Sequence, residues 1–444
     1  MPPSQEERRI RRIKIDGLFG QYNYDMTVPG STSPHDPNVL ILYGDNGSGK
    51  TTLLRLIYSL LSQPGGGRKT YIAQTPFRRL EVWFENGVSF VAQKFSRSTG
   101  TFRQSIHRKG RTLGAFTFKA ARDGSVGASS NSSEEKDFVQ VIKSVSVDLH
   151  YLPDDRKLKS ENDDMPPRAS HVLYDELMES RTYVEGERPR STPLEDASKS
   201  ALEWARKQMI AASRVGEKSA YTIYSTLIRK LAKSGESRAA KSAEAMQLLG
   251  DKLTRLAQAN EELAKMELTS EINLRSIASA LKSGRRHNAA VYQVAKLYAD
   301  GTEARLKALS EFKALLDNFL RNVNSFFVDK TILFTLKEGF SIRSKTGQAL
   351  QLGQLSSGEK QLLLLMIDTL ASSDQAKIFV IDEPEISLNI KWQRNLLGAL
   401  LSCLPKRGSQ FIIATHSIQI LTNFKKYTVE LRAKKSSTHL LRHG

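Results

Sequence analysis

A glycine-rich segment between an apolar run and a helix-forming run has the residue types that bind phosphate. Residues 44–51 read GDNGSGKT, the spacing GxxxxGK[ST]; the apolar run Val39–Tyr43 precedes them and a helix-forming run, Thr52–Leu61, follows. Glycine lets the backbone wrap closely, so that its amides point at phosphate oxygens. Lys50 would place its charge on the β- and γ-phosphates and the Thr51 hydroxyl would ligate Mg²⁺. The sequence therefore predicts an ATP-binding loop of Asn46, Gly47, Ser48, Gly49, Lys50, Thr51 and Thr52.

Two later apolar runs end in titratable side chains. Ile378–Ile381 leads into Asp382 and Glu383, and a second buried-strand pattern ends at His416. At such a strand end an aspartate can reach the Mg²⁺ shell, so Asp382 and Thr51 are the predicted metal ligands. Glu383 can polarise the attacking water or accept its proton. A histidine at a strand end is usually structural, but its order after the acidic pair favours a γ-phosphate sensor. We therefore predict Glu383 and His416 as the catalytic residues.

A third segment, LSSGEKQ at residues 355–361, opens an apolar helix-forming run. A turn of small polar residues and glycine at a helix start offers free amides and a positive dipole end to an anion. Ordinary helix caps have the same composition, so the bare pattern is weak. Its place just before the acidic strand makes Ser356 and Gly358 candidates for ATP contact.

Three regions of the chain must position these residues. Short strand patterns fill roughly 11–152, including a hairpin marked by Asn86-Gly87; helical spacing of apolar residues runs from about 191 to 327; strand patterns return from about 331. This order predicts an α/β fold with an N-terminal part over 1–160, a helical insertion over 161–330 and a C-terminal part over 331–444. A break at residues 282–285 could be the tip of an antiparallel helical pair. The insertion could be a packed bundle or a projecting coiled coil, and the sequence leaves both open.

Composition limits the class of protein and of partner. The 444 residues include 66 Lys and Arg against 47 Asp and Glu, a formal net charge of +19. Such an excess attracts DNA or an acidic protein, although a basic surface without a partner has the same composition. Cys403 is the only cysteine, so no intrachain disulfide can form, which fits a reducing cytoplasm. No apolar run approaches the length of a membrane span, and the first residues lack a signal-like apolar region, so we expect a cytoplasmic protein with no membrane partner.

Together the motifs resemble the soluble branch of the ABC ATPase superfamily, which includes the structural-maintenance, zinc-hook repair and OLD-like ATPases. The resemblance rests on LSSGE at 355–359 and DEPEISLN at 382–389, whose residues 387–389 fall at the family's D-loop. IDGLFGQYNYDM at 15–26 and YLPDDR at 151–156 add to it. The resemblance implies a two-lobed ABC ATPase head interrupted by a helical, coiled-coil-like insertion, with ATP and Mg²⁺ as cofactors. Heads of this kind pair face to face, so that Ser356 and Gly358 would contact a γ-phosphate held by the partner's Lys50.

The chain departs from that branch in three ways. It has no CxxC, which excludes a zinc-hook apex. The glutamine of the family's Q-loop is not obvious: Gln93 and Gln74 are candidates, while Arg156 lies nearer the expected entry to the insertion. Only residues 417–444 follow His416, too few for the TOPRIM nuclease domain of OLD enzymes. We therefore expect no nuclease activity of the chain's own.

Compact ATPases of this kind resemble the ATPase subunits of bacterial two-component anti-phage systems, of which the PARIS ATPase is the closest likeness and the Septu ATPase the second. That resemblance implies an ATPase that senses infection and holds or releases a separate nuclease effector. The alternative is a DNA-repair or chromosome-handling ATPase of the RecF or zinc-hook type. A transporter subunit is disfavoured, because a long helical insertion separates the phosphate loop from the signature. The expected partners are a second copy, an effector, and DNA or a DNA-mimic protein bound by basic residues at 229–230, 285–286 and 425–442.

Overall fold

The computed structural model describes residues 9–29, 38–95, 98–127, 133–145, 148–154, 192–211, 243–269, 274–283, 289–373, 378–403 and 409–432. The chain folds into two compact units: the first joins residues 1–193 to 356–444, and the second spans Leu194–Leu355. The first unit is therefore interrupted in sequence by the second. Each unit is described below by itself.

A parallel sheet holds the strand ends that the sequence singled out. Its order is β14-β3-β13-β12-β8, and all of its pairings are parallel. The strands are β3 (Val39–Tyr43), β8 (Leu149–Leu152), β12 (Ile378–Asp382), β13 (Gln410–Thr415) and β14 (Thr428–Glu430). The central strands β12 and β13 are buried along their whole length and mostly apolar, as expected where both faces of a parallel sheet are covered. Because the strands run in one direction, their carboxyl ends share one edge.

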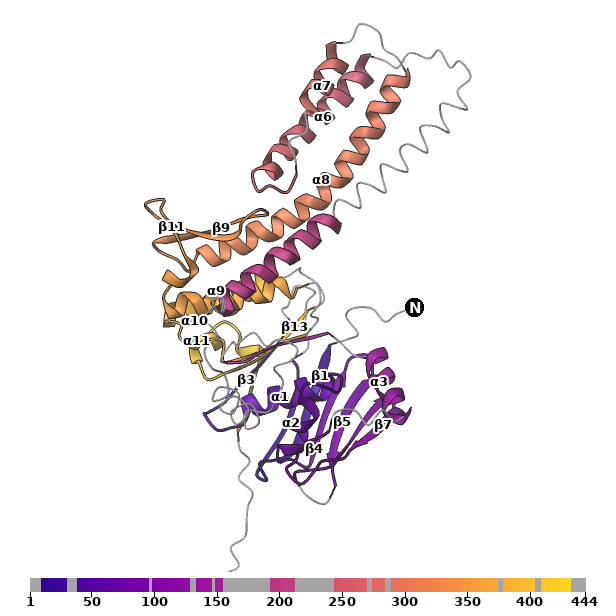
Figure 1. Cartoon of the computed structure of the whole chain (residues 1–444), viewed down its shortest axis with the longest axis vertical. Helices are drawn as coiled ribbons and strands as arrows, with labels where there is room; N and C mark the ends of the chain where they lie inside the picture. The colour runs from indigo at the N-terminus through magenta and orange to yellow at the C-terminus, as the bar shows by residue number, and fades with distance from the viewer. Residues whose placement is uncertain are drawn as a thin grey trace, which may run out of the picture. The chain divides into compact units, whose positions relative to one another are not determined.

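An antiparallel sheet forms the other layer of the first unit, in the order β2-β1-β4-β5-β6-β7. Its strands are β1 (Ile10–Leu18), β2 (Tyr22–Thr27), β4 (Arg79–Phe84), β5 (Val88–Lys94), β6 (Phe102–Arg108) and β7 (Arg111–Phe118). The predicted hairpin at Asn86-Gly87 joins β4 to β5, with Gly87 at a φ of 76°. Figure 1 shows α3 (Ser133–Val145) beside β7, where Phe138 lies against Phe116.

Helix α1 (Lys50–Leu61) links the two sheets. Most of its side chains are buried, and it contacts β5 as well as β8, β12 and β13. Gln410 adds a direct bridge, because its side chain accepts from the Ile10 amide at 2.8 Å and donates to the Ile10 carbonyl at 2.9 Å. The remaining helices of this unit are α2 (Arg68–Gln74), α9 (Ser357–Ala371), α10 (Ile390–Ser402) and α11 (Ile418–Leu421), with a 3-10 turn η3 (Lys425–Tyr427). The phosphate-loop helix is thus fixed inside the core of the unit.

The second unit is mainly helical. It contains a helix over residues 193–211, then α6 (Ala243–Ala264), α7 (Leu274–Ser283) and α8 (Ala289–Asn324). Helix α6 packs against both α7 and α8 (Figure 1). The end of α8 is fixed to a small sheet, since the Asn324 side chain makes two hydrogen bonds to the backbone of Ile332. That sheet has the order β11-β10-β9, from β9 (Lys330–Thr335), β10 (Gly339–Ser344) and β11 (Ala349–Leu350), and the 3-10 turn η2 (Leu352–Gln354) follows.

The predicted fold class, an α/β head interrupted by a helical insertion, is confirmed. Among the described residues, no helix combines the length and the apolar character needed to cross a membrane. Several predicted features lie outside the described residues: Arg156, the basic pairs at 229–230 and 285–286, and the end of the basic tail. The described helix α7 does end at Ser283, within the predicted break at 282–285.

Candidate functional site

The phosphate loop lies between β3 and α1, as its sequence context predicts. Gly47 and Gly49 have φ values of 83° and 84°, a conformation that suits glycine. A Cβ at Gly49 would come within 2.9 Å of the Leu18 side chain, so this position also lacks space. Ser48 and Lys50 are buried, whereas Asn46, Gly47 and Thr51 are exposed and Thr52 is half-buried. The loop therefore has the compact form that directs amides at an anion.

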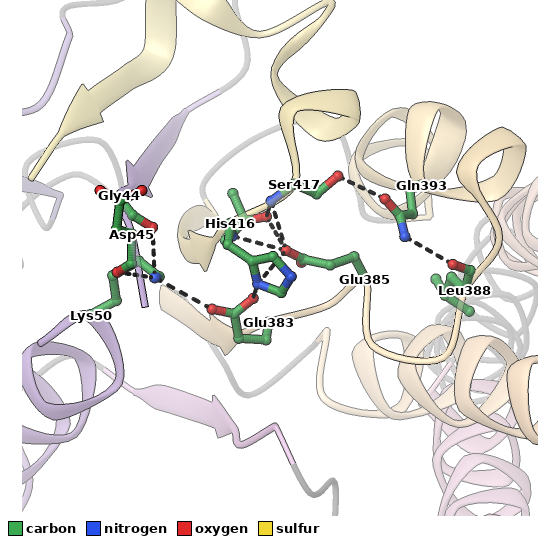
Figure 2. A network of polar contacts seen from close by, with 10 residues as sticks. Gly44, Asp45, Lys50, Glu383, Glu385, Leu388, Gln393, His416 and Ser417 are labelled. Atoms are coloured by element: carbon green, nitrogen blue, oxygen red, sulfur yellow. Dashed lines mark hydrogen bonds and ion pairs between the residues drawn. The ribbon is translucent and has the colours of Figure 1, made fainter. Parts of the chain in front are cut away.

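Lys50 bends back over this loop. Its Nζ donates to the Gly44 carbonyl at 2.8 Å and to the Asp45 carbonyl at 3.1 Å. The same nitrogen lies 3.6 Å from Glu383 Oε1 (Figure 2). Because the ammonium group is almost fully buried, a charged acceptor beside it lowers the cost of its desolvation. The lysine is thus held between the loop and the end of β12.

Glu383 and His416 meet beside Lys50. The His416 Nδ1 is hydrogen-bonded to Glu383 Oε2, so one carboxylate contacts both a lysine and a histidine (Figure 2). Burial raises the pKa of Glu383 to about 7, and the nearby Glu385 acts in the same direction, while His416 opposes the shift. A carboxylate with a pKa near neutrality is suited to accept a proton at physiological pH. The side chain of His416 is half exposed.

The end of β12 and the start of α1 offer oxygen atoms that fit a divalent cation. Asp382 is fully buried, and neither of its carboxylate oxygens has a hydrogen-bond partner. The Thr51 hydroxyl lies near enough to lower the Asp382 pKa, but not in ordinary hydrogen-bond geometry. A buried carboxylate without a partner is costly unless it is protonated or binds a cation. Oxygen donors of this kind are the ligands that Mg²⁺ prefers.

Asp154 is a residue of this site that the sequence analysis did not select. It follows β8, which pairs with β12 in parallel, so it belongs to the same sheet edge. Burial raises the pKa of Asp382 to about 6, and the charge of Asp154 adds to that shift. The motif YLPDDR at residues 151–156 could have identified Asp154, because its acidic residues follow a strand pattern, as Asp382 and Glu383 do at the end of IFVIDE.

Residues 355–361, called the signature segment below, cap α9 and pack against the Ser387 backbone. Ser356 is the N-cap: its Oγ accepts from the Glu359 amide at 3.3 Å, and Glu359 Oε2 accepts from the Ser356 amide at 2.8 Å. A Cβ at Gly358 would lie 2.7 Å from the Ser387 carbonyl oxygen. Glycine is therefore needed here for close packing, a reason that the sequence did not reveal. The side chains of Ser356 and Ser357 are exposed.

The two glutamines considered for the Q-loop make contacts within the N-terminal part of the chain. Gln93, exposed on β5, accepts from Arg79 at 3.0 Å. Gln74 lies at the end of α2, and its amide donates to the Asp123 carbonyl at 3.4 Å. These contacts do not bring either side chain to the edge that holds Lys50, Asp382 and His416. Arg156 lies outside the described residues.

Comparison with known proteins gives one family match and several structural ones. The family model described as "AAA domain, putative AbiEii toxin, Type IV TA system" matches residues 39–422. No curated protein matches the chain. Among solved structures, it is similar to an Smc head domain with an extended coiled coil bound to the C-terminal domain of ScpA from Pyrococcus furiosus, at 12% identity, 96% and 94% coverage of the two chains and a TM-score of 0.39. It is also similar to the SMC head domain from Thermotoga maritima, at 10% identity, 93% and 91% coverage and a TM-score of 0.33.

Proposed function

This chain belongs to the AAA-domain family whose description links it to the AbiEii toxin of a type IV toxin–antitoxin system, and from that premise we propose that it is an ABC-type ATPase that binds and hydrolyses ATP. The observation that carries the proposal is the meeting of Lys50, Glu383 and His416 at one sheet edge. Lys50 begins α1, whereas Glu383 and His416 directly follow β12 and β13, and the three are connected through the Glu383 carboxylate. Such a cluster has the parts that phosphoryl transfer to water requires.

The roles follow from the contacts. Loop amides from Asn46 to Thr52 bind the phosphates, and Lys50 exchanges its carbonyl acceptors for phosphate oxygens. Thr51 and Asp382 would hold Mg²⁺, which neutralises charge on the phosphates when bound. Glu383 orients water and accepts its proton, and His416 holds the carboxylate in place and faces the terminal phosphate.

We propose further that the active form is a dimer of heads. Ser356 and Ser357 are exposed at the start of α9, where the helix dipole favours an anion. Ser356 and Gly358 would complete the ATP site of a second copy. The functional division of the chain that we propose is a phosphate-loop part over 1–160, a helical insertion over 161–330 and a signature part over 331–444.

The cellular role that we propose is anti-phage defence: the ATPase senses infection and holds or releases a separate nuclease effector. The resemblance to the ATPase subunits of PARIS-type systems and the toxin–antitoxin link in the family description support this role. We expect the chain to have no nuclease activity with Mg²⁺ or Mn²⁺, because its acidic strand end is committed to ATP. The net charge of +19 favours DNA or an acidic protein as partner. The same charge also fits the alternative, a DNA-repair or chromosome-handling ATPase.

The proposal is tested by ATP hydrolysis across a protein dilution series. We expect Mg²⁺-dependent turnover whose specific activity rises with protein concentration, and a loss of nucleotide binding in Lys50→Ala. Specific activity that stays flat through the dimerisation range would contradict a shared site. Absence of any turnover or ATP binding would refute the ATPase itself. Purification from the native host, with identification of the bound proteins and nucleic acids, separates defence from repair.

A further inference from the structure

Glu385 lies two residues beyond Glu383 and forms a separate cluster of hydrogen bonds. Its side chain is only 3% exposed. One oxygen, Oε1, accepts from the Thr415 hydroxyl, from the His416 amide at 3.0 Å and from the Ser417 amide at 3.0 Å. Three consecutive residues, the last of β13 and the two that follow it, are thus bound to one carboxylate oxygen (Figure 2). This carboxylate fixes the backbone that carries His416.

A second set of contacts leads from Ser417 to the turn that contains Glu385. The Ser417 hydroxyl donates to Gln393 Oε1 at 2.7 Å, and Gln393 Nε2 donates to the Leu388 carbonyl at 2.8 Å. The Leu388 amide in turn donates to the Glu385 carbonyl at 3.0 Å. The segment 385–388 is therefore linked at both of its ends to residues 415–417, at Glu385 directly and at Leu388 through Gln393.

The same turn contacts the signature segment of its own chain. Ser387 has a φ of 66°, and its carbonyl oxygen is the atom against which Gly358 packs. A continuous set of contacts therefore runs from His416 through Glu385, Ser417 and Gln393 to the turn, and from the turn to Gly358. Both ends of this route lie in the first compact unit.

A metal site is the other chemistry that this cluster could offer, since ligand atoms of Glu383, Glu385 and His416 lie within 4.8 Å of one another. The contacts argue against it. The Oε1 of Glu385 faces two amide hydrogens and a hydroxyl, and the His416 Nδ1 is directed at Glu383. A cation at Glu385 Oε1 or His416 Nδ1 would have to compete with these donors, and only the buried Glu385 Oε2, which has no hydrogen-bond partner among the described residues, would be open to it. The arrangement fits a hydrogen-bonded support better than a coordination shell.

We infer that Glu385 is a positioning residue, and that the link Ser417–Gln393–Leu388 couples the hydrolysis site of a chain to that chain's own signature segment. The inference rests on the proposed function, in which the signature completes the site of a second copy. Movement of His416 on hydrolysis then displaces Ser417 and, through Gln393, the turn beside Gly358. Loss of ATP in one site thereby alters the surface offered to the other.

The test separates association from nucleotide binding. Ser417→Ala and Gln393→Ala each remove one neutral hydrogen bond of the link and leave Lys50, Asp382 and Glu383 intact. We expect the protein concentration at half-maximal specific activity to rise about three- to tenfold in each, with ATP affinity measured at low protein concentration within about twofold of wild type. The variant Ser417→Thr keeps the hydroxyl and should restore the wild-type value. Glu385→Gln should lower kcat about tenfold or more with little change in KM, because the three donors lose a charged acceptor.

The outcomes distinguish this inference from the proposed function. If the wild-type protein does not hydrolyse ATP and its specific activity does not rise with protein concentration, the proposed function fails. Suppose instead that the wild-type protein hydrolyses ATP with a specific activity that rises with protein concentration. If Ser417→Ala and Gln393→Ala then reach half-maximal specific activity at the wild-type protein concentration, the link does not couple the two sites and the inference is wrong. Equal losses of ATP affinity, thermal stability and association would also overturn it, since a purely structural support produces that result. If Glu385→Gln does not fold, the variants Ser417→Ala, Gln393→Ala and Ser417→Thr still test whether the link couples the two sites.

Discussion

Replacing Gly358 with alanine tests the packing of the signature segment directly. The new Cβ would lie 2.7 Å from the Ser387 carbonyl oxygen, 0.7 Å inside the 3.4 Å at which ordinary van der Waals contact begins. The obstacle is backbone, and Ser387 already has a φ of 66°, so the turn has little freedom to retreat. Overpacking of this kind costs about 1–3 kcal/mol. Alanine in a helix regains about 0.5–1 kcal/mol over glycine, so we expect a net loss of up to about 2.5 kcal/mol.

A second glycine provides the matched control. Gly398 lies on the exposed side of α10, and no atom comes within 4 Å of a Cβ built there. Gly398→Ala should therefore stabilise the protein by about 0.5–1 kcal/mol. Thermal unfolding of both variants measures the difference, with Gly358→Ala below wild type and Gly398→Ala above it. ATP hydrolysis should fall in Gly358→Ala alone. An increase in stability in both variants would refute the packing argument.

Three further predictions concern charge. Lys50→Ala should abolish nucleotide binding in a calorimetric titration. Glu383→Gln should instead keep ATP bound and stop turnover, because an amide cannot accept the proton. Normal turnover in Glu383→Gln would show that Glu383 is not catalytic. Asp382→Asn should raise the Mg²⁺ concentration for half-maximal turnover about tenfold or more, and an unchanged Mg²⁺ requirement would exclude Asp382 as a ligand. Burial lowers the pKa of Lys69, and likewise of Lys94, to about 7, below the 10.5 of a free lysine. The unfolded state then holds more protons between these values, so the free energy of unfolding should rise from pH 7 to 10, by up to about 1.4 kcal/mol per pH unit for each lysine. Lys69→Met should remove about half of that slope in urea unfolding, and a slope equal to that of wild type would show that Lys69 stays charged in the folded state.

The convergence of Lys50, Asp382 and His416 could be predicted from the sequence because each follows an apolar strand. Parallel strands place their carboxyl ends at one edge, so three motifs far apart in the chain become neighbours once the strands pair. Asp154 obeys the same rule and was within reach of the same argument. The rule fixes which residues meet, but not which atoms bond.

The contacts of Gly358 and Glu385 could not be predicted in the same way. Both depend on the course of the turn between β12 and α10, and a helix-capping pattern gives no reason to place a glycine against that turn. From the sequence alone, Glu385 in DEPEISLN could equally well be an exposed acidic residue. Its burial becomes clear only from the three donors at and after the end of β13. The conformation of this turn is set by tertiary contacts, and the local sequence does not determine it.

The backbone conformation at Glu383 explains how Asp382, Glu383 and Glu385, close together in the chain, reach different surroundings. Its φ of 43° is unfavourable for a residue with a side chain, yet its amide is held by the Ala414 carbonyl at 2.9 Å. This bond keeps the chain in the sheet for one residue beyond Asp382 while the left-handed turn redirects the Glu383 side chain toward Lys50 and His416. An ordinary extended residue would continue the strand and point this carboxylate to the face that Ile381 occupies, opposite to Asp382. The unfavourable conformation thus accompanies the change of direction that brings Glu383 to His416 and Glu385 to the backbone of residues 416 and 417, an arrangement that fits the proposed ATP site.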